Sequence, residues 1–154
     1  MKYEIVELEE KVVAGIKIRT TNQNGKAIQD IGTIWKELFT DGIYENIPSK
    51  LNNKTIGLYT EYERDYTKPY IFIAGAEINT KTVSRQKIVS KVIPKGKYAK
   101  FVIIGDVQTS VGQAWQEIWN MNLKRKYTCD FEEYQNNSKD MQKQEIHIYI
   151  AIED

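Results

Sequence analysis

The sequence has very few residues of the kinds that build disulfides or metal sites. Its 154 residues include one cysteine, Cys129, and one histidine, His147. A single cysteine excludes an internal disulfide framework and a multi-cysteine zinc site. One imidazole excludes a histidine-rich metal site, and the sequence has no P-loop, dinucleotide fingerprint or zinc-helix motif. We therefore predict a chain that works without a metal or a cofactor.

The sequence also lacks an excess of charge and a long hydrophobic run. Its 22 Lys and Arg residues nearly balance 21 Asp and Glu residues, so direct nucleic-acid binding, which needs clustered cations, is not expected. The longest aliphatic stretch, 148–152, is far shorter than the roughly 20 residues of a membrane-spanning helix. The N-terminus has no cationic segment before an apolar one, as a signal peptide would. We expect a cytoplasmic protein with no membrane segment.

Aromatic residues are plentiful: ten Tyr, three Trp and four Phe. Apolar residues alternate with period two in several segments, which predicts strands at 12–21, 70–76, 97–104 and 146–152. Two other segments have the spacing of amphipathic helices. Their apolar residues are Ile28, Ile31, Trp35, Leu38 and Phe39 in one, and Val111, Trp115, Ile118, Trp119 and Leu123 in the other.

The two helical segments reveal an internal repeat. Residues 31–39 align without a gap on residues 111–119, with Gly, Trp and Glu at matching positions. Segments 58–62 and 70–74 resemble 130–134 and 147–151, in the same order after each helix. We predict a single α+β domain over 1–154, made of duplicated strand-helix-strand-strand units related by a pseudo-twofold axis. Repeat 1 covers about 11–80 and repeat 2 about 88–154, with two main helices on an antiparallel sheet.

Glu132 is the main candidate for a functional residue. By alternation Asp130, Glu132 and Tyr134 share a face, and the neutral Thr60 stands at the matching position of repeat 1. Tyr149 lies opposite the isoleucine face of 146–152, and we expect its surface to coincide with that of Glu132. A carboxylate partly removed from water needs a donor or a cation, and aromatic rings add cation–π attraction. A solvated strand glutamate is the alternative.

Four more aromatic residues are candidates for the walls of such a pocket. They are Tyr62, Phe72, Trp115 and Trp119. A place in the hydrophobic core is the alternative, because Trp115 and Trp119 lie on a helical apolar stripe, which usually faces the interior. Tyr62 and Phe72 have the same ambiguity. A pocket is expected at the seam between the repeats, since neither repeat covers that surface alone.

The order of these motifs resembles the GyrI-like effector-binding domain family, in its stand-alone, integron-associated type. The resemblance rests on residues 93–101, 114–119, 130–134 and 146–152, and spans about Val12 to Glu153. It implies a pocket at the seam in which Glu132 pairs with cationic, lipophilic ligands, with Tyr149 as an aromatic neighbour. Many relatives carry a helix-turn-helix module and regulate transcription in response to drugs. No such module is expected here, because Met1 closely precedes the first expected strand.

Three functions remain open at this point. The leading interpretation is a small-molecule effector-binding protein that captures lipophilic cations, including multiple drugs, in transcriptional regulation or drug sequestration. A separate regulator or protein partner would then respond to it. The alternatives are a hydrolase of strained cyclopropane-type electrophiles that uses the same pocket, and a protein-interaction module such as a gyrase modulator. We assign no catalytic residues.

Overall fold

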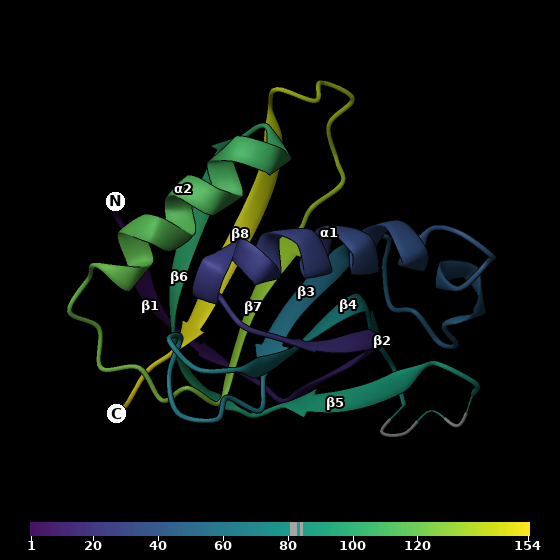
Figure 1. Cartoon of the computed structure of the whole chain (residues 1–154), viewed down its shortest axis with the longest axis horizontal. Coiled ribbons are helices and arrows are strands. Elements are labelled where there is room, and N and C mark those ends of the chain that lie inside the picture. The colour runs from purple at the N-terminus through teal and green to yellow at the C-terminus, as the bar shows by residue number, and fades with distance from the viewer. Residues whose placement is uncertain (81–82, 84) are drawn as a thin grey trace.

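The chain folds into one antiparallel sheet, with two α-helices over the same face of it (Figure 1). The computed structural model describes residues 1–80, 83 and 85–154, and within them the sheet has eight strands. The strands are β1 (Glu4–Leu8), β2 (Lys11–Thr20), β3 (Thr55–Thr60), β4 (Tyr70–Ile78), β5 (Val89–Ile93), β6 (Gly96–Gly105), β7 (Cys129–Tyr134) and β8 (Gln144–Ala151). The helices are α1 (Lys26–Leu38) and α2 (Val107–Trp119).

The order of strands across the sheet is β1-β6-β8-β7-β3-β4-β2-β5. Each repeat therefore supplies three adjacent strands, β2-β4-β3 and β6-β8-β7, and the two sets meet where β3 pairs with β7. The element orders β2-α1-β3-β4 and β6-α2-β7-β8 are the same. This arrangement confirms the α+β fold with duplicated units and a pseudo-twofold axis at the centre of the sheet.

The two edge strands, β1 and β5, were not predicted. Each one precedes the first strand of its own repeat in the chain but pairs with the other repeat, β1 with β6 and β5 with β2. An edge strand leaves backbone donors and acceptors unpaired. The pairing of β3 with β7 joins the two halves into a single sheet, and each repeat also receives its edge strand from the segment that precedes the other repeat.

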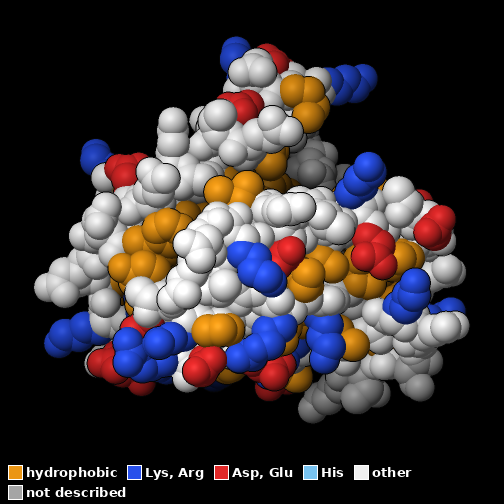
Figure 2. Space-filling model, in the orientation of Figure 1, with side chains coloured by type: hydrophobic (Ala, Val, Ile, Leu, Met, Phe, Trp, Pro, Cys, Tyr) orange, Lys and Arg blue, Asp and Glu red, His pale blue; other side chains and the backbone are white. Residues whose placement is uncertain are grey.

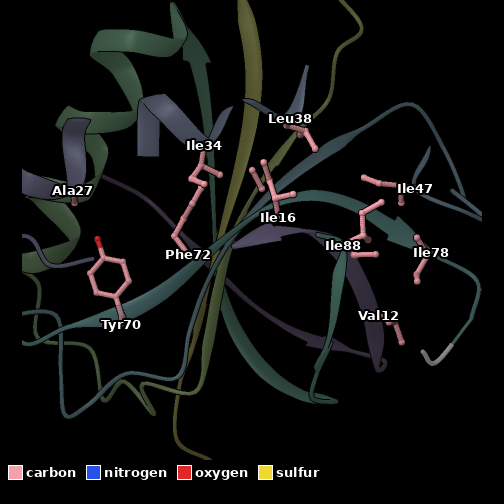
Figure 3. Close-up of a cluster of buried hydrophobic side chains, with 12 residues drawn as sticks. Val12, Ile16, Ala27, Ile34, Leu38, Ile47, Tyr70, Phe72, Ile78 and Ile88 are labelled. Carbon is pink, nitrogen blue, oxygen red and sulfur yellow. The ribbon is translucent and has the colours of Figure 1, made fainter. Parts of the chain in front are cut away.

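The hydrophobic core has clusters on both faces of the sheet. One cluster lies under α1, where Ile34 and Leu38 pack over Ile16 of β2 and Phe72 of β4 (Figure 3). A second cluster lies under α2 and includes the isoleucines of β8. A third, which includes Phe131, lies on the opposite face, where β1 and β5 contribute partly buried side chains. The sheet therefore buries apolar residues even on the face without helices.

The apolar stripe of the first helix differs from the prediction. Ile28 is 84% exposed and Phe39 is 55% exposed, whereas Ala27 and Ile34 are buried. Ala27, Ile31, Ile34 and Leu38 follow the i, i+4, i+7, i+11 spacing of one helical face, and Ile28 lies about 100° away from Ala27 around the axis. The predicted position of the helix is confirmed, but its buried face is rotated about the helix axis from the predicted one.

Candidate functional site

Glu132 lies in β7 at the centre of the sheet, under the helices. Its partners in register are Gly57 of β3 and Ile148 of β8, so its side chain points to the same face as the isoleucines of β8. Glu132 is 1% exposed. Gly57 leaves room for the carboxylate, because a Cβ at that position would lie 2.9 Å from Glu132 Oε1.

The Glu132 carboxylate accepts three hydrogen bonds from neutral donors. The hydroxyl of Tyr59 donates to Oε2 over 2.7 Å, and the indole Nε1 of Trp115 donates to the same oxygen over 2.6 Å. The hydroxyl of Tyr134 donates to Oε1 over 2.8 Å. Among the described residues, no Lys, Arg or His forms an ion pair with this carboxylate.

Burial raises the pKa of Glu132, although the hydrogen bonds from Trp115, Tyr59 and Tyr134 act in the opposite direction. Burial also holds the pKa values of Tyr59 and Tyr134 well above their usual value, so both hydroxyls remain protonated donors. A buried carboxylate is stabilised best by hydrogen bonds together with a counter-ion. The donors are present here, but no cation of the described chain lies within ion-pair distance of Glu132.

A cavity of about 320 Å³ lies next to this carboxylate, between the first turn of α1 and the last turns of α2; we call it the tyrosine cavity. Hydrophobic side chains gather at the surface between the two helices (Figure 2). Tyr59 and Trp115 line the cavity and stand between it and Glu132. Its lining also includes Ala27, Ile28, Ile31, Tyr62, Tyr66, Tyr70, Val111, Gly112, Trp119 and Arg125. A ligand there would contact aromatic rings, with the carboxylate directly behind them.

A buried ion pair lies at the same cavity. Arg125 Nη2 donates to Asp130 Oδ2 over 2.7 Å, and the side chains are 5% and 0% exposed. Asp130 also accepts from the Tyr62 hydroxyl over 2.6 Å and from the backbone N–H of Ala151 over 2.9 Å. The guanidinium lies over the ring of Tyr127, 4.3 Å from its centroid. Its Nε and Nη1 are buried and have no hydrogen-bond partner within the described chain.

The structure brings three of the predicted wall residues together. Tyr62, Trp115 and Trp119 all line the tyrosine cavity, and Trp119 stacks on Tyr66 with ring centroids 5.5 Å apart. Phe72 lies deeper. It is fully buried in the α1 cluster, with its ring 5.0 Å from that of Tyr59, and supports the wall from behind.

The prediction that Tyr149 shares a surface with Glu132 is wrong. Tyr149 pairs in register with Phe131 and stacks on its ring at 4.6 Å, on the face of the sheet without helices. Ile148, not Tyr149, is the partner of Glu132. The isoleucine face of β8 is therefore the face of Glu132, and the alternate residues of β8 point away from the site.

The predicted alignment of the strands of the two repeats is also wrong, because it matches residues that lie on opposite faces of the sheet. Thr60 was matched to Glu132, but Thr60 pairs with Cys129 and its hydroxyl lies 3.3 Å from the thiol, on the opposite face from Glu132. Phe72 was matched to Tyr149, yet the two lie on different faces. Because side chains alternate with period two, a slip of one residue reverses every orientation in a strand.

Three important residues were not selected from the sequence as site residues: Tyr59, Tyr134 and Arg125. The alternation pattern did place Tyr134 on the face of Glu132, and the hydrogen bond confirms this. Correct pairing of β3 with β7 would have identified Tyr59, which faces Glu132 only in that register. Arg125 belongs to a short basic run in the sequence, and its burial depends on the fold alone.

The comparisons with known proteins agree with this fold. Residues 4–152 match the family described as Cass2, integron-associated effector binding protein, and the chain belongs to this family. A solved structure of an integron cassette protein from the mobile metagenome of Vibrio cholerae is 32% identical, with a TM-score of 0.73, over 98% of this chain and 95% of that one. The predicted resemblance to the integron-associated effector-binding type is thus confirmed.

Two further relatives cover nearly the whole chain. YobU of Bacillus subtilis (strain 168), a protein named as a transcriptional regulator, is 28% identical over 96% of each chain. The structure of SAV2435 bound to tetraphenylphosphonium has a TM-score of 0.77 at 20% identity, over 99% of this chain and 94% of that one. At 20% identity, the likeness to SAV2435 shows a shared fold and nothing further.

The described residues contain neither a membrane-spanning helix nor a metal-binding cluster. None of their helices has the length and apolar character to cross a membrane. Nor do they include a group of three or more His, Cys, Asp or Glu side chains placed to hold a metal ion.

Proposed function

We propose that this effector-binding protein takes lipophilic cations in the tyrosine cavity, with Glu132 as the charge that selects them. The observation that carries the proposal is the buried carboxylate with three neutral donors and no counter-ion among the described residues. A bound cation would supply the missing charge. Tetraphenylphosphonium, the ligand of SAV2435, is a ligand of this class.

The aromatic residues between Glu132 and the cavity extend the electrostatic effect of the carboxylate to a bound ligand. Tyr59 and Trp115 each donate a hydrogen bond to Glu132, which makes their rings more electron-rich. A cation over the face of such a ring gains about 0.5–2 kcal/mol, with the larger value in a desolvated site. Binding of a cation favours the ionised form of Glu132. Because burial raises the pKa of Glu132, affinity should fall as the pH falls through that raised pKa.

Two probes of one shape test the role of charge. Tetraphenylphosphonium and tetraphenylborate have similar size and opposite sign, and binding can be followed by calorimetry and by the fluorescence of Trp115 and Trp119. We expect the phosphonium to bind and the borate not to bind. Glu132→Gln should weaken phosphonium binding about tenfold or more, as loss of a charge interaction of about 1.4 kcal/mol predicts.

The matched control is Glu133→Gln, the next residue in β7. Glu133 is also largely buried, but its neighbours Gln135, Lys54 and His147 lie on the other face of the sheet. This variant should bind the phosphonium as the wild type does. Equal binding of both probes, or equal loss in the two variants, would contradict the proposed charge selection.

The effector-binding family and the name of YobU as a transcriptional regulator support a regulatory role. We propose that the protein with its ligand bound acts on a separate partner, such as a DNA-binding protein. Sequestration of the ligand, without such a partner, would need only the binding step. The hydrolase alternative needs Glu132 to reach water and substrate. Since the carboxylate is 1% exposed behind Tyr59 and Trp115, we do not propose it.

A further inference from the structure

A second cavity, of about 660 Å³, lies at the other ends of the two helices, between the last turns of α1 and the first turn of α2. We call it the asparagine cavity. Four aromatic residues line it: Trp35, Phe39, Tyr44 and Tyr134. The remaining lining residues are Gly32, Asn53, Thr55, Val107, Gln108 and Asn136, so no charged side chain of the described chain contributes.

The two cavities are equivalent under the internal repeat. The gapless alignment of the helices adds 80 to each residue number. It pairs Gly32, Trp35 and Phe39 of the asparagine cavity with Gly112, Trp115 and Trp119 of the tyrosine cavity. It also pairs Val107 and Gln108 with Ala27 and Ile28, which line the tyrosine cavity. Duplication has thus produced two aromatic hollows, one on each side of the pseudo-twofold axis.

The carboxylate of Glu132 accepts hydrogen bonds from residues that line both cavities. Glu132 Oε2 accepts from Tyr59 and Trp115, which line the tyrosine cavity. Glu132 Oε1 accepts from Tyr134, which lines the asparagine cavity. The ring of Tyr134 also meets that of Trp35 edge-on, with centroids 5.3 Å apart. The charge in repeat 2 therefore polarises an aromatic wall in each cavity.

From this geometry we infer that the asparagine cavity is a second site for a lipophilic cation and that the two sites compete for the charge of Glu132. The inference rests on the proposed function. The tyrosine cavity fills first, because two of the three donors to Glu132 line it. A single negative charge compensates one cation, so the second cation meets the repulsion of the first. The α1 residues that line the two cavities are centred roughly seven residues apart, which corresponds to about 10 Å along the helix. At that separation and an effective dielectric constant of about 20, this repulsion weakens the second binding step roughly tenfold or more.

Equivalent positions in the two helices allow a matched pair of substitutions, each of which fills one cavity with a larger side chain. Ile28→Trp would fill the tyrosine cavity, and Gln108→Trp would fill the asparagine cavity. Both residues are exposed at the surface of their helices, so a larger side chain does not displace the core. Circular dichroism and thermal melts check that each variant keeps its fold. Calorimetric titration with tetraphenylphosphonium is then compared among the wild type and the two variants.

We expect two binding steps in the wild type, the second weaker by about tenfold or more. Gln108→Trp should remove the weak step and leave the strong one unchanged. Ile28→Trp should leave one step, at the asparagine cavity. The indole N–H signals in nuclear magnetic resonance identify the sites independently, since Trp115 lines one cavity and Trp35 the other. The two signals should shift with different midpoints.

Three outcomes would overturn the inference in different ways. A single step that Gln108→Trp does not alter would refute the second site and leave the proposed function intact. Two steps of equal affinity would refute the competition for Glu132. If the wild type bound no phosphonium at either cavity, the proposed function would fail, and this inference with it.

Discussion

Replacement of Glu132 by glutamine should leave the folded protein at least as stable as the wild type at neutral pH. The two side chains have the same shape. A glutamine oxygen can accept from Tyr59 and Trp115 as Oε2 does now, and its NH₂ group can donate to the Tyr134 hydroxyl, which accepts as well as it donates. The variant thus keeps three hydrogen bonds and removes a buried charge without a counter-ion.

The pH dependence of this difference follows from the raised pKa of Glu132. A glutamate in the unfolded chain has a pKa of about 4.3. Because the folded pKa is higher, the wild type loses stability relative to Glu132→Gln as the pH rises from about 4.3 through the folded pKa. Each unit by which burial raises the pKa corresponds to about 1.4 kcal/mol of unfolding free energy. Above the folded pKa the difference is constant.

Urea denaturation of both proteins between pH 4 and pH 8 measures this difference directly. Subtraction of the two curves removes the groups that titrate in both proteins. Glu133→Gln serves as the control on the opposite face of the sheet. A variant less stable than the wild type by more than about 1 kcal/mol at pH 7 would refute the reasoning, because that is the net value of a lost hydrogen bond. So would a difference that does not depend on pH.

The remaining predictions concern the residues around the site. Arg125→Met should lower the unfolding free energy by about 3–5 kcal/mol, because it leaves Asp130 buried without its cation, and the double variant with Asp130→Asn should recover part of this loss. Gly57→Ala should cost about 1–3 kcal/mol and weaken phosphonium binding, since the new Cβ would lie 2.9 Å from Glu132 Oε1. Gly32→Ala, where nothing lies within 4 Å, should instead stabilise α1 by about 0.5–1 kcal/mol. Urea denaturation and calorimetry check all of these, and similar effects of the two glycine variants would contradict the explanation.

Much of the architecture was accessible from the sequence because it depends on local periodicity. The 3.6-residue spacing located both helices, period two located four of the eight strands, and the internal repeat located two more, β3 and β7. The edge strands β1 and β5 are short, and their burial patterns show no fully buried face. Their pairing with the opposite repeat is a long-range choice that no local pattern indicates.

The site was predicted only in part, and the reason is register. Glu132 was identified because alternation places it on one face with Tyr134, and a carboxylate partly removed from water is costly without a partner. Tyr149 was misplaced because the alternation within each strand does not say which face of β8 lies beside Glu132. That face depends on the pairing of Ile148, not Tyr149, with Glu132.

The amino-acid sequence by itself determined the duplicated units, the helices, the near-balance of positive and negative charge and the family. It did so because amphipathic spacing and composition are properties of neighbouring residues. Only the tertiary structure decided that Tyr59, Trp115 and Tyr134 meet at one carboxylate, and that the carboxylate stands between two equivalent hollows. These contacts join residues as many as 73 positions apart, and a strand shifted by a single residue would have broken them.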